Sequence, residues 1–287
     1  MTLRIENLTV RIPLTRGHQV HAATLINMEV IKGEIHALIG ESGCGKSTIA
    51  QAITGLLPVK ARVTGTVRYN GENILGRQSG YLGRHIALIP QSAATFMTPV
   101  RTMGAQLAET VEILKGPLTP EKLMAKVDLN ANVLRLYPHE ISGGMAQRAA
   151  VAFALAGAPD VIIADEPTAS LDPARKEGIF RLLRQIANQG AAVILITHDI
   201  STLLDTGIVD QLSVCYASRI VESGLASILL NGGAENRYTR DLLAALPRNG
   251  LHRMRGVPPE LTDLSDEYTY ESRIALSGGL SDRFDCQ

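Results

Sequence analysis

Hydrophobic residues recur along the chain with two different spacings. Four short and almost wholly apolar runs, at 35–39, 86–89, 161–164 and 192–196, predict buried strands. The stretch 173–188 instead carries apolar residues three or four positions apart, which predicts an amphipathic helix. Strands that alternate with helices predict an α/β protein with a mainly parallel sheet covered on both faces.

The N-terminal part of the chain adds further strand and helix signals. Residues 3–12 alternate between apolar and polar and predict a strand at the edge of a sheet. Residues 62–75 predict a hairpin that turns at Asn70-Gly71, a pair that favours tight two-residue turns. The stretch 48–57 is compatible with a helix and ends before a proline.

The pattern changes between about 92 and 150, where β-branched runs disappear. Apolar residues recur at helical spacing in 103–114 and 121–127. We therefore expect a helical insertion between two strands of the parallel sheet.

The helical and strand periodicities fade after residue 230. A short helix is predicted near 239–246, and the tail from Pro247 is rich in Gly, Pro, Ser and charges, which predicts an irregular segment. The expected organisation is a principal domain over 1–230 and a C-terminal extension over 231–287.

The composition of the 287 residues excludes several classes of protein. Twenty-eight basic residues balance 28 acidic ones, so no excess of positive charge indicates a nucleic-acid partner. Three scattered cysteines argue against a disulfide framework or a zinc knuckle. We expect no signal peptide and no membrane span, because the apolar runs are far shorter than the roughly 20 residues that cross a bilayer.

A phosphate-binding motif follows the first buried strand and opens a helix, as its chemistry requires. Glycines let backbone N–H groups turn toward an anion, a lysine reaches the β- and γ-phosphates, and a serine hydroxyl ligates Mg²⁺. The alternative is a glycine-rich loop that serves merely as a turn. We expect Cys44 to have no redox function in the loop. The candidate nucleotide-binding residues are Gly40, Glu41, Ser42, Gly43, Cys44, Gly45, Lys46, Ser47 and the following Thr48.

Two carboxylates end the buried strand at 161–164. In an open α/β sheet this edge is where ligands bind. Asp165 is the candidate metal residue, and Glu166 is the candidate base that polarises an attacking water. The alternative is a pair of ordinary acids at a strand end.

Four further elements make the sequence resemble the ATP-binding cassette (ABC) ATPases over about residues 1 to 247. Residues 137–148 are similar to the signature segment of that family, and Ser170-Leu171-Asp172 to its D-loop. His198 resembles the switch histidine, and Gln91 resembles the Q-loop glutamine. The resemblance implies a P-loop NTPase fold with a mainly parallel sheet, an N-terminal antiparallel β region and a helical insertion, with ATP and Mg²⁺ as cofactors.

The resemblance also assigns roles to these residues. His198 acts in catalysis beside Glu166, and Gln91 senses Mg²⁺ and water. A serine and glycines at a helix start offer a second anion site, which in the family caps the ATP of another subunit in a head-to-tail dimer. The residues are Ser142, Gly143 and Gly144, with Asp172 of the D-loop nearby. The alternative for Ser142 is a helix cap with a tight turn.

Within the family, the sequence most resembles the ATPase subunits of dipeptide, oligopeptide and nickel importers. The segments that carry this are 40–47, 137–140, Met145, 238–247 and 256–261. The resemblance implies import of a peptide, nickel or metal chelate through two membrane permeases, with an extracytoplasmic solute-binding protein acting indirectly. It also implies a second ATPase subunit, identical or different, and a peripheral position at the cytoplasmic face of the bacterial inner membrane.

Several positions depart from the subfamily pattern. The tail has a single cysteine, Cys286, so we expect no iron–sulfur cluster. Ala146 stands where the signature usually has a basic residue. No aromatic residue precedes Ala22-Ala23, which leaves Val20 or His21 to pack on adenine.

Two other functions compete with transport. ABC proteins of translation or DNA repair usually carry two cassettes or a long coiled-coil insertion, and this sequence has neither. A P-loop kinase of small molecules would leave the Ser-Gly-Gly segment and His198 unexplained. The transported substrate stays open at this point.

Overall fold

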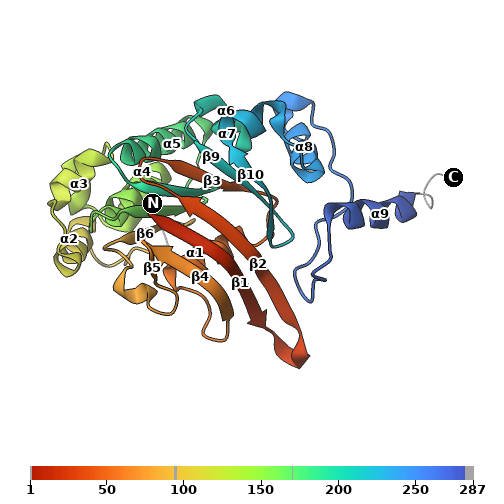
Figure 1. Cartoon of the computed structure of the whole chain (residues 1–287). Coiled ribbons are helices and arrows are strands. Elements are labelled where there is room, and N and C mark those ends of the chain that lie inside the picture. Colours follow the sequence, from red (N-terminus) through yellow and green to blue (C-terminus); the bar gives the residue numbers. More distant parts are fainter. Residues whose placement is uncertain (1, 94–95, 170, 282–287) are drawn as a thin grey trace.

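The chain folds around two β-sheets, which Figure 1 shows together with the helices that cover them. The structure is a computed structural model that describes residues 2–93, 96–169 and 171–281. In this part of the chain, every helix is too short or too polar to cross a bilayer.

The larger sheet has six strands, and five of them run parallel. Across the sheet, their order is β10 (Arg219–Leu225), β9 (Gln211–Tyr216), β3 (Ile35–Ile39), β8 (Ala192–Ile196), β7 (Val161–Asp165) and β6 (Ile86–Ile89). Only β10 pairs antiparallel with its neighbour. The predicted α/β class is confirmed, while β9 and β10 extend the sheet beyond the predicted strands.

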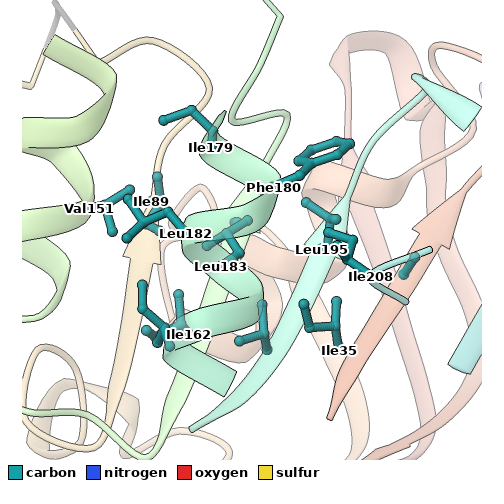
Figure 2. Packing of buried hydrophobic residues seen from close by; sticks show 14 of the residues in the cluster. Ile35, Ile89, Val151, Ile162, Ile179, Phe180, Leu182, Leu183, Leu195 and Ile208 are labelled. Atoms are coloured by element: carbon teal, nitrogen blue, oxygen red, sulfur yellow. The ribbon is translucent and has the colours of Figure 1, made fainter. Parts of the chain in front are cut away.

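The central strand β3 is buried on both faces of this sheet. Ile35, Ala37 and Ile39 join the core on one face, whereas Leu38 joins the core on the other. This two-sided burial explains why every residue of the strand except His36 is apolar. Figure 2 shows the first core, where Leu183 of α5 (Pro173–Asn188) packs over the sheet.

The smaller sheet is antiparallel, as the resemblance implies for the N-terminal region. Its order is β2 (Gln19–Val30), β1 (Leu3–Pro13), β4 (Arg62–Tyr69) and β5 (Glu72–Asn73). The hairpin with Asn70-Gly71 at its turn is confirmed, since both residues have positive φ angles. The edge position predicted for residues 3–12 is wrong, because β2 and β4 pair with β1 on both sides.

The helix α1 (Lys46–Thr54) belongs to the core that the two sheets share. Its Ile49 and Ile53 are buried in one cluster with Leu3 and Ile5 of β1 and with Leu38 of β3. The first turn of α1 is thereby fixed directly after the end of β3.

The predicted helical insertion lies between β6 and β7. It holds α2 (Met103–Leu114), α3 (Pro120–Lys126) and α4 (Gly143–Ala154), of which α2 has the predicted bounds. The remaining helices are α6 (Ile200–Thr206), α7 (Ala226–Ile228), α8 (Arg237–Ala244) and α9 (Tyr270–Ser281). Short turns of other helix types lie at Thr15–Gly17, Gln78–Gly80, Ala131–Arg135, Pro138–Glu140, Leu229–Gly233 and Pro247–Asn249.

The C-terminal extension is more ordered than the sequence predicts. The tail from Pro247 was expected to be irregular, yet it contains the helix α9 and a short bridge between Thr262 and Val20 of β2. Tyr270 of α9 packs edge-on against Tyr238 of α8, with ring centres 5.2 Å apart. These tertiary contacts, rather than a strong local pattern, explain the helix. Cys286 lies outside the described residues.

Candidate functional site

The loop between β3 and α1 has a backbone that only glycine fits at two positions. Gly40 has a φ of 151°, and a side chain there would come within 2.1 Å of the carbonyl oxygen of Cys215. Gly45 has a φ of 104° and would meet the carbonyl oxygen of Ala22 at 2.1 Å. The loop is therefore wedged between β2 and the β9–β10 hairpin, and its glycines are required by close approach as well as by conformation.

Lys46 and Ser47 begin α1 and face the loop and the neighbouring strand. Lys46 is 6% exposed, and its Nζ donates to the carbonyl oxygens of Gly40 and Glu41 at 2.9 Å each. The Ser47 hydroxyl donates to Asp165 Oδ1 at 3.0 Å. Burial, reinforced by the charge of Glu166, raises the pKa of Asp165. A hydroxyl and a carboxylate at this distance match the oxygen ligands that Mg²⁺ prefers.

Glu166 occupies a backbone conformation that is unusual for its residue type. Its φ is 49°, and its N–H donates to the carbonyl oxygen of Ile196 at 2.9 Å. The residue is 8% exposed, and its Oε2 makes no hydrogen bond with the described part of the chain. His198 Nδ1 lies 2.6 Å from that oxygen, a distance at which a protonated imidazole forms an ion pair, and the contact lacks the alignment of a hydrogen bond. A buried carboxylate oxygen is thus held beside an exposed imidazole.

A cavity of about 390 Å³ is lined by Lys46, Ser47 and Glu166, whereas Asp165 and His198 are not among its lining residues. Gln91, two residues beyond β6, shares the cavity with the loop and with Glu166. The lining residues are Ile12, Val20, Ala22, Ser42, Gly43, Gly45, Lys46, Ser47, Thr48, Gln91, Glu166 and Leu261. The structure therefore brings together residues that the sequence carries on five separate segments, plus Leu261 of the extension.

The signature residues lie elsewhere on the chain. Ser142 caps α4 by accepting a hydrogen bond from the N–H of Met145 at 3.3 Å, as the alternative interpretation expected. Ser142 and Gly144 line a separate cavity of about 370 Å³, which shares no lining residue with the first. A side chain at Gly143 would meet no described atom within 4 Å, so this turn is open. The structure does not bring these residues onto the chain's own phosphate loop.

The D-loop borders the second cavity. Leu171 is among the residues that line it. Asp172 caps α5 by accepting from the N–H of Arg175 at 3.1 Å, and it also pairs with the Arg175 guanidinium at 3.1 Å. Asp172 is therefore not in the cavity of the phosphate loop, and Ser170 lies outside the described residues.

The C-terminal extension binds the phosphate loop through an ion pair and a hydrogen bond, which the sequence analysis did not predict. Arg273 of α9 is 3% exposed and donates to both carboxylate oxygens of Glu41, at 2.6 and 3.2 Å. The hydroxyl of Tyr238 accepts from the N–H of Glu41 at 3.2 Å. Glu41 and Arg273 are 232 positions apart, and no local pattern pairs residues at such a separation.

Comparisons with known proteins match this chain to ABC transporter proteins. A family profile described as ABC transporter matches residues 24–169, about half of the chain. The oligopeptide transport ATP-binding protein of Mycobacterium tuberculosis is 35% identical over 91% of this chain, which spans only 46% of that relative. The dipeptide transport ATP-binding protein of Bacillus subtilis is 35% identical, over 90% of this chain and 82% of the relative.

Solved structures share the fold. A dimeric ATP-binding cassette bound to ADP and phosphate matches with a TM-score of 0.67 at 23% identity, over 78% of this chain and 98% of the other. An ATP-binding subunit of an ABC transporter matches with a TM-score of 0.66 at 24% identity, over 84% and 99%. Since the profile covers about half of the residues and the relatives align along most of the chain, this protein belongs to the ABC transporter family and has the fold of its ATPase cassettes.

Proposed function

We propose that the chain is the subunit of a peptide importer that binds and hydrolyses ATP. The observation that carries this proposal is the single cavity shared by the phosphate loop, Gln91 and Glu166, with His198 against Glu166. ABC proteins of translation or DNA repair are not favoured by the relatives, which are named as peptide-transport proteins.

The phosphate loop binds the triphosphate in this proposal. Its backbone N–H groups and the start of α1 attract the anion, and Lys46 exchanges its contacts with the Gly40 and Glu41 carbonyls for the β- and γ-phosphates. Ser47, Asp165 and Gln91 hold Mg²⁺, because the first two already place their oxygens 3.0 Å apart. The ion neutralises charge on the phosphates when it is bound.

Glu166 removes a proton from the attacking water. The water oxygen attacks the γ-phosphorus, the bond to the β–γ bridging oxygen breaks, and ADP and phosphate are released. The Oε2 atom suits this role because it is buried and free of hydrogen bonds with the described residues. His198 keeps the carboxylate in place from 2.6 Å.

A second subunit completes each nucleotide site. Ser142, Gly143 and Gly144, with Asp172 nearby, cap the ATP held by a partner cassette. This assignment is supported by the cavity of Ser142 and Gly144, which shares no residue with the cavity of the chain's own loop. The partner is a second copy or a related ATPase subunit. ATP binds the closed pair of subunits more tightly than the open pair. This difference in binding free energy drives closure, which moves the attached permeases.

The remaining assignments follow from the family. The ATPase domain spans 1–230, with the helical subdomain at about 92–150, and the extension spans 231–287. The protein works at the cytoplasmic face of the inner membrane on two permeases, which an extracytoplasmic solute-binding protein supplies. Peptide is preferred over nickel as cargo, because the relatives at hand are named for peptides.

Replacement of Glu166 by Gln tests the proposal. Steady-state hydrolysis should fall roughly 10²–10⁴-fold, as for a lost general base, while the affinity for Mg-ATP persists. Glu112→Gln, at an exposed site on α2, is the matched control and should hydrolyse ATP normally. Hydrolysis by the Glu166→Gln variant at the control rate would refute the assigned role.

A further inference from the structure

The extension reaches the mouth of the nucleotide cavity by pairing with β2. The N–H of His21 donates to the carbonyl oxygen of Leu261 at 2.8 Å, and the N–H of Asp263 donates to that of Gln19 at 2.8 Å. Thr262 forms an antiparallel bridge with Val20 between these two bonds. The segment 261–263 thus lies beside the start of β2 and is joined to it by an isolated β-bridge.

Two aspartates fix this segment to the cassette. Asp263 accepts from the N–H of Gln19 at 2.9 Å and pairs with His18. Asp266 pairs with Arg11 of β1 at 3.3 Å and with Arg219 of β10 at 3.1 Å. These contacts connect the segment to strands of both sheets. They restrict its position, and with it the position of the Leu261 side chain.

The cavity wall divides into two chemical parts. Polar atoms come from the phosphate loop, Lys46, Ser47, Gln91 and Glu166. The aliphatic side chains come from two parts of the chain: Ile12, Val20 and Ala22 of the paired strands β1 and β2, and Leu261 of the extension. None of the described residues lining this cavity is aromatic. A nucleotide with its phosphates on the loop must therefore set its base against the aliphatic part.

We infer that Leu261 of the extension, with Val20 and Ile12, forms the wall on which the base of ATP packs. The inference rests on the proposed nucleotide-binding function and deepens it. A purine base is flat and has two apolar faces. Aliphatic side chains can bury such a face against water, as an aromatic ring does, but they do not add the stacking energy of an aromatic ring. A segment outside the ATPase core thus replaces the aromatic residue that the sequence lacks before Ala22.

Leu261→Ala separates base binding from phosphate binding. Mg-ATP and Mg-tripolyphosphate, which lacks the base and ribose, are titrated calorimetrically into the full chain. The variant should bind Mg-ATP roughly three- to tenfold more weakly, as expected for the loss of a buried aliphatic contact, with tripolyphosphate affinity unchanged. Leu261→Met, of similar volume, should restore the affinity for Mg-ATP.

Leu276→Ala is the matched control, since Leu276 lies on the same extension but is 69% exposed. It should bind both ligands like the parent chain. Unchanged Mg-ATP affinity in Leu261→Ala would overturn the inference, as would an equal loss for both ligands, because the segment would then act on the loop. If the parent chain binds neither ligand, the proposed function fails first.

Discussion

Glu166 carries two local costs that packing alone does not explain. A glutamate with a φ of 49° costs on the order of 1–3 kcal/mol, and its buried Oε2 lacks a hydrogen bond with the described residues. Such strain persists where the surroundings impose it, here through the bond from its N–H to Ile196. At the residue scale, this combination is the strongest structural support for a catalytic Glu166.

Lys46 provides a prediction at the same scale. Lys46→Ala should weaken Mg-ATP binding roughly 10- to 100-fold, because a charge-assisted hydrogen bond to phosphate is worth about 1.5–3 kcal/mol. Calorimetric titration measures the effect. Lys122→Ala, on the exposed face of α3, should leave the affinity unchanged, and a Lys46→Ala chain that binds like this control would argue against the loop assignment.

The raised pKa of Asp165 predicts a pH effect. Burial disfavours the ionised carboxylate, so a proton competes with Mg²⁺ at a higher pH than for an ordinary aspartate, whose pKa is about 3.9. On acidification, Mg²⁺-dependent ATP affinity should begin to fall above that value. Titrations at stepped pH measure it, and Asp165→Asn should retain only the pH dependence that the phosphates of ATP contribute themselves. An affinity that is constant down to the ordinary range would contradict a magnesium role.

The sequence predicted most of these residues, because their chemistry depends on local motifs. The loop, Asp165 and Glu166 each follow a buried strand, and strand ends are recognisable from apolar runs. Arg273 and Leu261 could not be found this way. Each acts on a segment more than 200 positions away, and only the folded chain makes them neighbours.

Elements differ in how strongly their own sequence determines them. The helices 103–114 and 173–188 have their predicted bounds, since the apolar spacing and a cap at Thr102 or Asp172 agree. The helix α9 has no comparable pattern, and its position depends on Tyr270 and Arg273. The edge assignment of β1 failed because alternation reports one buried face and not the number of neighbouring strands.

Arg273 gives the prediction for the element scale. Arg273→Ala should lower the free energy of unfolding by about 3–5 kcal/mol, because it leaves the mostly buried Glu41 carboxylate without its partner. Urea denaturation measures the change. The control is Arg253→Ala in the same extension, at an exposed position. Equal midpoints for both variants would show that the pair adds nothing to stability.

At the scale of the whole molecule, the main feature is that the cavity of the phosphate loop is separate from the cavity of Ser142 and Gly144. The phosphate loop and Ser142 lie in cavities without a common residue, as expected if one chain supplies two different halves of the nucleotide sites in the proposed dimer. Closure of a head-to-tail pair satisfies both halves at once, which is the closed symmetry expected of most soluble oligomers.

Association of the chain follows from this arrangement. Glu166→Gln with Mg-ATP should sediment as a dimer in analytical ultracentrifugation, since the trapped nucleotide bridges two subunits. The same chain with an added Ser142→Arg should stay monomeric, because the larger side chain fills the open turn. A Glu166→Gln chain that remains monomeric at every concentration would exclude pairing between two copies.

The ion pair between Arg273 and Glu41 limits which C-terminal tails can be joined to this ATPase domain in a chimaeric protein. If a transplanted tail had no arginine at position 273, the mostly buried Glu41 of the loop would be left without its counter-ion. Chimaeras joined near residue 247 should therefore express poorly unless position 41 is exchanged together with the tail. In this chain, the loop and the tail therefore depend on each other as a single structural unit.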